Sequence, residues 1–374
     1  MKQEGYFEAI AVLVGTVIGA GVLGIPYVVA KSGFLTGAIM IALLGLAIMT
    51  TNLCLGEVVL RTDGNHQLTG YAEKYLGKTG KKLMTFTMIF GIYGALIAYL
   101  IGEGEALSAI FGASPLHFSL MFFTFMAFVI FVGLKMIKKL ELMLSFIVLT
   151  IVLLISAFAV NKIQLVNLMT FDIKNIFIPY GVILFAFLGA AAVPEMKEVL
   201  TRDRKKLKRA IIVGSLIPFF AYLIFALVVV GATGLNTTQI ATIGLGNLIG
   251  DYMVVFGNLF AIFAMGTSFL TLGLALKGMY SYDYKLSHNK AWLLTCFVPL
   301  GLFLLGIKSF IGTIGITGSI AGGIEGILII SMFWKAKKLG KRKPEYSSDG
   351  SKLIGTLLIT VFALGILYTI FNLL

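Results

Sequence analysis

Eleven long apolar segments limit what this chain can fold into. Each is close to the roughly 20 residues that an α-helix needs to cross the hydrocarbon core of a membrane. Charged residues make up only 13% of the chain, about half the share that is usual in soluble domains. The sequence therefore predicts an all-α polytopic membrane protein with eleven transmembrane helices. The segments cover residues 7–30, 34–59, 83–111, 117–134, 140–160, 176–195, 210–232, 252–276, 291–306, 309–334 and 352–372.

The basic residues predict an orientation. The net charge of +13 would by itself also suit a nucleic-acid-binding protein. If the N-terminus is cytoplasmic and the spans alternate, all but four of the 30 Lys and Arg residues fall in cytoplasmic segments. This follows the positive-inside rule and leaves no need for a nucleic-acid partner. We expect a multi-pass protein of the cell (plasma or inner) membrane, surrounded by lipid, with a cytoplasmic N-terminus and an external C-terminus.

The first span contains a segment that is poorly suited to a continuous helix. Residues 15–26 (GTVIGAGVLGIP) hold four glycines and a proline. Glycine costs roughly 1 kcal/mol relative to alanine inside a helix. Backbone groups released at membrane depth need partners inside the protein or in a water-lined cavity. A break near residues 19–21 that serves a ligand is one interpretation, and close helix packing through small residues is the alternative.

The sixth span carries a similar feature. In residues 185–195 (FAFLGAAAVPE) a run of small residues again precedes a proline. Five spans separate the two features, so they lie in helices that cross the membrane in opposite directions. Two interrupted helices at matching places indicate the inverted repeat of a secondary transporter. We expect one transporter domain over residues 1–374, with repeats at 1–160 and 176–334 and one extra span at 352–372.

Polar residues inside two later spans have two interpretations each. Ala264, Thr267 and Ser268 stand at i, i+3 and i+4 in span 8, on one helix face. Their hydroxyls can serve a ligand or bond back to the preceding turn. Glu325 in span 10 is an intramembrane carboxylate and so a functional candidate, although a salt bridge to a nearby lysine also suits its position.

The first motif resembles that of the amino acid–polyamine–organocation superfamily, at residues 15–23. Within this superfamily the chain is most similar to the amino acid/auxin permeases and the bacterial hydroxy and aromatic amino acid permeases. Supporting stretches follow in the family's order at residues 74–77 (KYLG), 98–102 (AYLIG), 214–218 (GSLIP) and 267–270 (TSFL). The resemblance implies a fold of five-plus-five inverted repeats with broken helices 1 and 6, and secondary active uptake of a free amino acid.

The resemblance places the substrate at the two breaks. Free N–H groups at residues 19–21, at the start of the second half of span 1, suit an amino acid carboxylate. Carbonyls released at residues 185–187 can accept hydrogen bonds from the substrate ammonium, and Phe187 resembles the family's aromatic gate. Tyr99 in span 3 either lines the same cavity or is a packed tyrosine. The predicted substrate-binding residues are Gly19, Ala20, Gly21, Tyr99, Phe185, Ala186, Phe187 and Gly189.

The resemblance also implies a cation site between spans 1 and 8. The matching groups are the carbonyls of Gly15, Ile18 and Ala264 and the hydroxyls of Thr267 and Ser268. Five neutral oxygens suit a hard cation such as Na⁺. Sodium-coupled amino acid/auxin relatives have an asparagine side chain at the place of Gly15, however, and the bacterial aromatic permeases are generally proton-coupled.

Proton coupling requires an ionisable side chain within the spans. Some proton-coupled members of the superfamily use a lysine in span 5, and residues 140–160 contain none. The coupling ion, Na⁺ or H⁺, is therefore open, with Na⁺ slightly favoured by the predicted geometry. The predicted proton carriers are Glu103, Glu105, Glu195 and Glu325.

The sequence lacks the features of an enzyme. Cys54 and Cys296 lie in apolar segments without metal-ligand spacing, and the three histidines form no cluster. We expect no catalytic residues and no cofactor besides the coupling ion. The expected function is a cation-coupled symporter that works by alternating access on an aromatic, hydroxylated or other neutral amino acid. The alternative is a passive channel or an amino acid sensor on the same fold.

Overall fold

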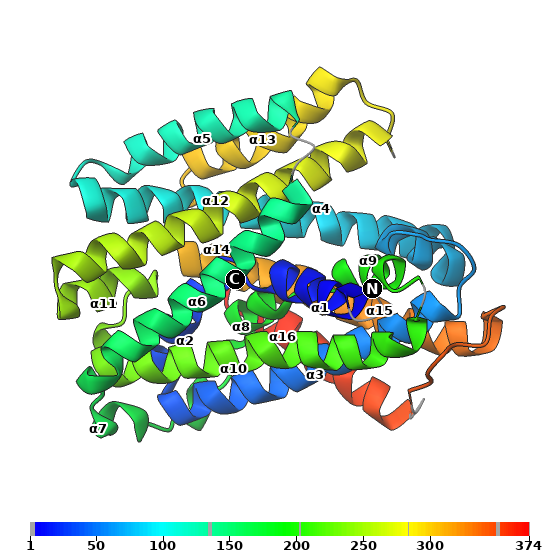
Figure 1. Ribbon diagram of the computed structural model, residues 1–374, viewed down its shortest axis with the longest axis horizontal. Coiled ribbons are helices and arrows are strands. Elements are labelled where there is room, and N and C mark those ends of the chain that lie inside the picture. The colour runs from blue at the N-terminus through cyan, green and yellow to red at the C-terminus, as the bar shows by residue number, and fades with distance from the viewer. Residues whose placement is uncertain (1–3, 134–136, 202, 283, 349–351, 374) are drawn as a thin grey trace.

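The chain folds into a bundle of helices, most of which lie side by side along its long axis (Figure 1). Within the residues that the computed structural model describes, there are helices and no strands, which confirms the predicted all-α class. The described residues are 4–133, 137–201, 203–282, 284–348 and 352–373. Outside them lie three of the basic residues that predict the orientation: Lys2, Lys135 and Arg202.

Helices occupy all of the predicted apolar segments. In the described part of the chain, seven helices are each long and apolar enough to cross a membrane, and α1 with α2 make an eighth unit as a bent pair. The chain is therefore a multi-pass membrane protein. The helices at the predicted segments are α1 (Glu4–Val17) with α2 (Gly21–Ser32), α3 (Phe34–Leu60), α4 (Leu68–Phe111), α5 (Pro115–Val132), α6 (Ile137–Ala159), α8 (Tyr180–Phe187) with α9 (Ala192–Val199), α10 (Leu207–Thr233), α12 (Asp251–Tyr282), α13 (His288–Leu304), α14 (Phe310–Thr317) with α15 (Gly323–Leu339), and α16 (Lys352–Phe371).

Both interruptions expected from the sequence are present. Helix α1 ends at Val17 and α2 begins at Gly21, with a bend of 56° between them. Helix α8 ends at Phe187 and α9 begins at Ala192. Both interruptions therefore coincide with the runs of small residues that precede a proline. In the first run, three glycines in seven residues disfavour a continuous helix, as helix propensities indicate.

Helix α4 combines a span with the polar connector that precedes it. The connector is helical from Leu68, and the chain turns at Gly77, whose φ of 74° suits glycine alone among the common residues. Tyr75 is buried, and its hydroxyl lies 2.7 Å from that of Thr62. The helical segment before Gly77 thus packs on the residues that follow α3.

Besides short 3₁₀ turns, three further elements were not predicted from the sequence. Helix α7 (Leu165–Leu168) lies in the loop after α6, and α11 (Ala241–Ile249) packs against α10 and α12. The third is a π-helical turn, η5 (Gly318–Gly322), inserted between α14 and α15. Turns of this kind are rare and occur frequently at functional sites.

The π-helical turn and the residues before it pack on α8 at backbone distance. A Cβ added at Gly181 of α8 would overlap the carbonyl oxygen of Gly315, and one at Gly318 would overlap the carbonyl oxygen of Gly181. Small residues at membrane helix interfaces permit such approaches. Helix α8 is therefore fixed against η5 by contacts that leave no room for a side chain.

We expect Gly181→Ala to lower the free energy of unfolding by about 1–3 kcal/mol, because an added methyl group overpacks this contact. Gly301→Ala is the matched control, since a Cβ at Gly301 would meet nothing within 4 Å. Thermal unfolding of the detergent-solubilised protein measures both. Equal melting temperatures for the two variants would contradict the proposed close contact.

Candidate functional site

A cavity of about 240 Å³ lies where the two breaks meet. Its lining comes from the end of α1, the start of α2, the end of α8 and the residues between α8 and α9, and from one side each of α4 and α12. The turn η5 adds Ala321, and α15 adds Glu325. The breaks touch directly, because a Cβ added at Gly21 would lie 2.7 Å from Cα of Ala186. The amino end of α2 and the carboxyl end of α8 thus face one space.

The cavity brings together most of the residues predicted to bind substrate. Phe187 lies outside the lining: it is buried and packs its ring on Tyr222, with ring centroids 5.1 Å apart. The roles of all these residues stay predictions. Those that line the cavity are Gly19, Ala20, Gly21, Tyr99, Phe185, Ala186 and Gly189.

The predicted cation ligands divide into two groups. Gly15 and Ser268 line the cavity, whereas Ile18, Ala264 and Thr267 are not part of its lining. The Thr267 hydroxyl donates to the carbonyl oxygen of residue 263 at 2.8 Å, which is the bond to the preceding turn that the sequence also allowed. Ser268 faces the first break, because a Cβ added at Gly19 would lie 3.0 Å from its Oγ.

The four predicted proton carriers are dispersed. Glu325 lines the cavity. Glu103 is fully buried, and neither of its carboxylate oxygens has a hydrogen-bond partner among the described residues. Glu105, further along α4, and Glu195 of α9 are both partly exposed, and neither lines the cavity.

Tyr222 of α10 connects the two breaks and was not predicted. Its hydroxyl donates to the carbonyl oxygens of Val17 (2.9 Å) and Ala186 (3.0 Å), which belong to the last turns of α1 and α8. Carbonyls at helix ends have no partner within the helix, and a phenol has one hydrogen to share between the two. The side chain is fully buried. A tyrosine in a span whose other polar side chain is Ser215 was the available signal, since a buried tyrosine hydroxyl usually has a partner.

The cavity extends towards one end of the bundle. On α4 the lining runs from Leu68 to Tyr99, the earlier part of the helix, and on α12 from Ser268 to Ala275, the later part. If successive spans alternate in direction, these parts of α4 and α12 lie towards the end that holds the N-terminus, whereas Gly15 of α1 lies next to the first break. The cavity then extends from the breaks towards the N-terminal end.

The loop after α6 covers the opposite end of the breaks. The backbone N–H groups of Phe34 and Leu35, at the start of α3, donate to the hydroxyl (2.8 Å) and the carbonyl oxygen (3.0 Å) of Thr170. The N–H of Asp172 donates to the Thr36 hydroxyl at 2.9 Å. These bonds hold the loop over the connection between α2 and α3.

Apolar spans, two interrupted helices in contact and a central cavity define a membrane transporter of the broken-helix class. The sequence profile of the Tryptophan/tyrosine permease family matches residues 2–372, and the chain belongs to this family. It is accordingly a transport protein and not an enzyme. This membership also confirms the superfamily resemblance inferred from the sequence.

Individual relatives match over nearly the whole chain. "Tyrosine-specific transport system 1" of Haemophilus influenzae is 30% identical, covering 95% of this chain and 93% of the relative. "Glutamine transporter 2" of Aliivibrio fischeri is 27% identical, covering 93% and 94%. The crystal structure of MhsT in complex with L-phenylalanine aligns with a TM-score of 0.66 and 15% identity over 98% of both chains, which shows a shared fold.

We expect Tyr222→Phe to lower the free energy of unfolding by about 1–3 kcal/mol, because it leaves two buried carbonyls without their donor. Tyr180→Phe is the control, since the buried Tyr180 hydroxyl has no hydrogen-bond partner among the described residues. Chemical or thermal unfolding in detergent compares the two variants. If Tyr180→Phe costs as much as Tyr222→Phe, the bridge between the breaks contributes nothing.

Proposed function

We propose that this permease is a secondary active transporter that takes up an amino acid with a cation by alternating access. The observation that carries the proposal is the meeting of the amino end of α2 and the carboxyl end of α8 at one cavity. N–H groups at residues 19–21 bind the substrate carboxylate, and carbonyls at residues 185–187 accept from its ammonium. A zwitterion is complementary to both helix ends.

The substrate that we propose is an aromatic or other neutral amino acid. Met88, Ile92 and Leu272 give one side of the cavity an apolar surface, and polar groups are few. Such a lining suits a large apolar side chain. The family's description, the name of the tyrosine-specific relative and the phenylalanine bound to MhsT point the same way. Because one relative is named a glutamine transporter, smaller neutral amino acids should be tested as well.

We further propose eleven spans arranged as two inverted repeats, residues 1–160 and 176–334, followed by span 11. The N-terminus is cytoplasmic and the C-terminus external in a cell membrane, as the distribution of basic residues indicates. In that orientation the cavity opens to the cytoplasm, so the conformation is inward-facing. The loop bonded to the start of α3 then closes the external side.

Two coupling ions fit this proposal. Na⁺ would bind the oxygens of Gly15, Ile18, Ala264, Thr267 and Ser268. A proton would bind one of the four glutamates. In either case binding of the cation and the substrate to the same closed state couples their movements.

Proteoliposomes containing the full-length protein test the function. Labelled tyrosine, tryptophan, phenylalanine and glutamine are supplied with a sodium gradient at equal pH, or with a pH gradient without sodium. We expect accumulation of at least one of them under one gradient and none without a gradient, since the gradient supplies the driving force. Equal uptake with and without either gradient would indicate a passive channel instead.

We expect Gly19→Val to weaken substrate binding by at least about tenfold, the equivalent of 1.4 kcal/mol. The added side chain meets Ser268 and fills the space that the carboxylate is proposed to occupy. Gly315→Ala is the control, because its Cβ would make only an ordinary contact of 3.6 Å with Val182. Isothermal titration of both folded variants with the transported amino acid gives the affinities. Unchanged affinity in Gly19→Val would refute the site.

A further inference from the structure

Glu325 is the acidic residue of the cavity lining. Among the residues described around the cavity, the other titratable side chain is Tyr99, and no lysine, arginine or histidine contributes. Glu325 therefore has direct access to the space that opens at the N-terminal end. The other three glutamates lie outside the lining.

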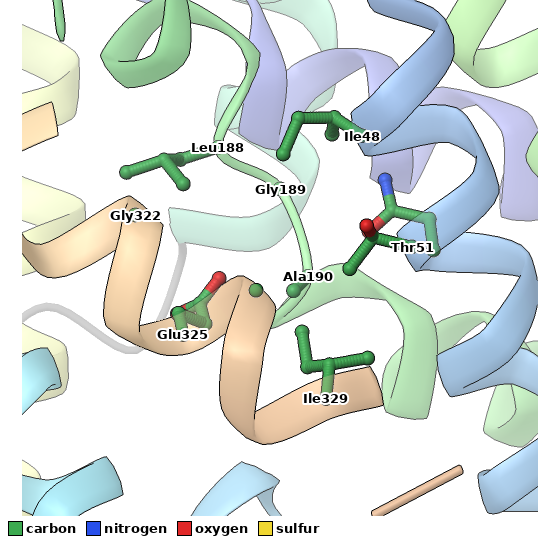
Figure 2. Close-up of a pocket in the computed structure, with 10 residues that line it drawn as sticks. Ile48, Thr51, Leu188, Gly189, Ala190, Gly322, Glu325 and Ile329 are labelled. Carbon is green, nitrogen blue, oxygen red and sulfur yellow. The ribbon is translucent and has the colours of Figure 1, made fainter. Parts of the chain in front are cut away.

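A second, small cavity lies between the break that joins α8 to α9 and the helices α3 and α15. Its volume is about 10 Å³, and Glu325, Thr51 and Asn52 supply polar side chains to its lining. That volume is near the minimum for one water molecule, which also needs two to four polar partners. Figure 2 shows Glu325 of α15 and Thr51 of α3 on opposite sides of the segment that carries Gly189 and Ala190. Glu325 thus borders a cavity on each side of the break.

The groups that face Glu325 from α3 and α4 carry no charge. Thr51 and Asn52 of α3 are neutral, and Tyr99 is the ionisable residue that α4 adds to the cavity. Glu57 of α3 is held in an ion pair near the end of that helix. No ion pair involving Glu325 is found in the described part of the chain, so the salt bridge to a lysine that the sequence allowed is not formed there.

Three charged or titratable side chains on the other neighbouring helices contact partners other than Glu325. Tyr368 of α16 stacks its ring on that of Phe177. Lys197 of α9 donates to the carbonyl oxygen of Gly64 at 2.6 Å, and Lys337 of α15 itself donates to a loop carbonyl at 2.6 Å. The turn η5 contributes no ionisable residue. The carboxyl group of Glu325 therefore exchanges protons mainly with cavity water.

Glu325 also comes shortly after η5, the π-helical turn that packs against the break between α8 and α9. It lies three residues after the π-helical turn, which contacts α8 at backbone distance through Gly318. Gly322, at the end of that turn, packs on Leu184 and Leu188, and Leu188 is the first residue of the break. We infer that a rearrangement of the break shifts η5 and changes the exposure of Glu325 to water, since these close contacts leave no room for the break to move alone.

We propose that Glu325 is the binding site of the coupling proton. The inference rests on the proposed cation symport and decides between its two ions. When the external side is open, water there delivers a proton to the carboxylate, an O–H bond forms, and the neutral acid can be enclosed at low cost. When the cavity opens at the N-terminal end, the O–H bond breaks and the proton passes to the cavity water.

The other candidates fit this role less well. Glu103 is enclosed between α4 and α12, with its Oε1 3.5 Å from where a Cβ on Gly266 would lie, and it borders neither cavity. The hydroxyl of Thr267 is already bonded to its own helix, and only two of the five sodium ligands line the cavity. Glu325 combines exposure to the cavity with contact to the break.

The test is Glu325→Gln in the full-length protein, with Glu8→Gln as the control because Glu8 is exposed on α1 and lines neither cavity. A gradient of about one pH unit supports up to about tenfold accumulation by one-proton symport. We expect this accumulation in the wild type and in Glu8→Gln. In Glu325→Gln we expect a ratio of about one, because glutamine cannot carry the proton. Tyrosine is the substrate probe.

Calorimetric titration with tyrosine in buffers of different ionisation enthalpy provides a second readout. The wild type should take up a proton on binding near the pH at which Glu325 titrates, and Glu325→Gln should bind tyrosine without proton uptake. Glu325→Asp keeps a carboxyl group and should retain proton uptake with a shifted pH dependence. This variant also tests the proposal if Glu325→Gln does not fold.

The outcomes separate the two proposals. Proton-driven accumulation by Glu325→Gln, or loss of tyrosine binding at every pH in Glu325→Gln and Glu325→Asp alike, would overturn the role of Glu325 as a proton site. Accumulation by the wild type with sodium alone would overturn it too, while leaving amino acid symport in place. If the wild type binds and transports none of the four amino acids, the proposed function itself fails.

Discussion

The backbone of an interrupted membrane helix needs hydrogen-bond partners that lipid cannot supply. In this permease Tyr222 meets that need by sharing its hydroxyl between Val17 of the first break and Ala186 of the second. The cavity, the facing helix ends and the exposure of Glu325 all depend on the two breaks staying together at this place. A transporter built this way is held at its centre by polar contacts, while its apolar surface faces lipid.

The features that the sequence predicted are those encoded locally. The helices were predicted from the length of the apolar segments, and both breaks from runs of small residues before a proline, at residues 15–26 and 185–195. Each of these signals lies within a few neighbouring residues. Tyr222 escaped prediction since its partners are 36 and 205 residues away in the chain. The π-helical turn escaped for a similar reason, as its glycines match a surface of α8 that sequence spacing does not reveal.

The candidate site likewise has one part that the sequence predicted and another that it did not. The helix ends at residues 19–21 and 185–187 follow from the breaks, so most of the predicted substrate residues lie together. Side-chain orientation was harder to predict. Phe187 points into packing with Tyr222, and Thr267 bonds to its own helix, although both occupy positions that the family resemblance favours. Helical spacing fixes which face a residue occupies, but tertiary packing decides which partner it meets.

The three hydrogen bonds between the loop after α6 and the start of α3 stabilise the conformation in which that end is closed. Opening that end requires all three to be exchanged for bonds to water, at a net cost of about 1 kcal/mol each. Together they contribute about 3 kcal/mol in favour of the closed end. A ligand that binds the open conformation more tightly must supply a difference in binding free energy that offsets this contribution.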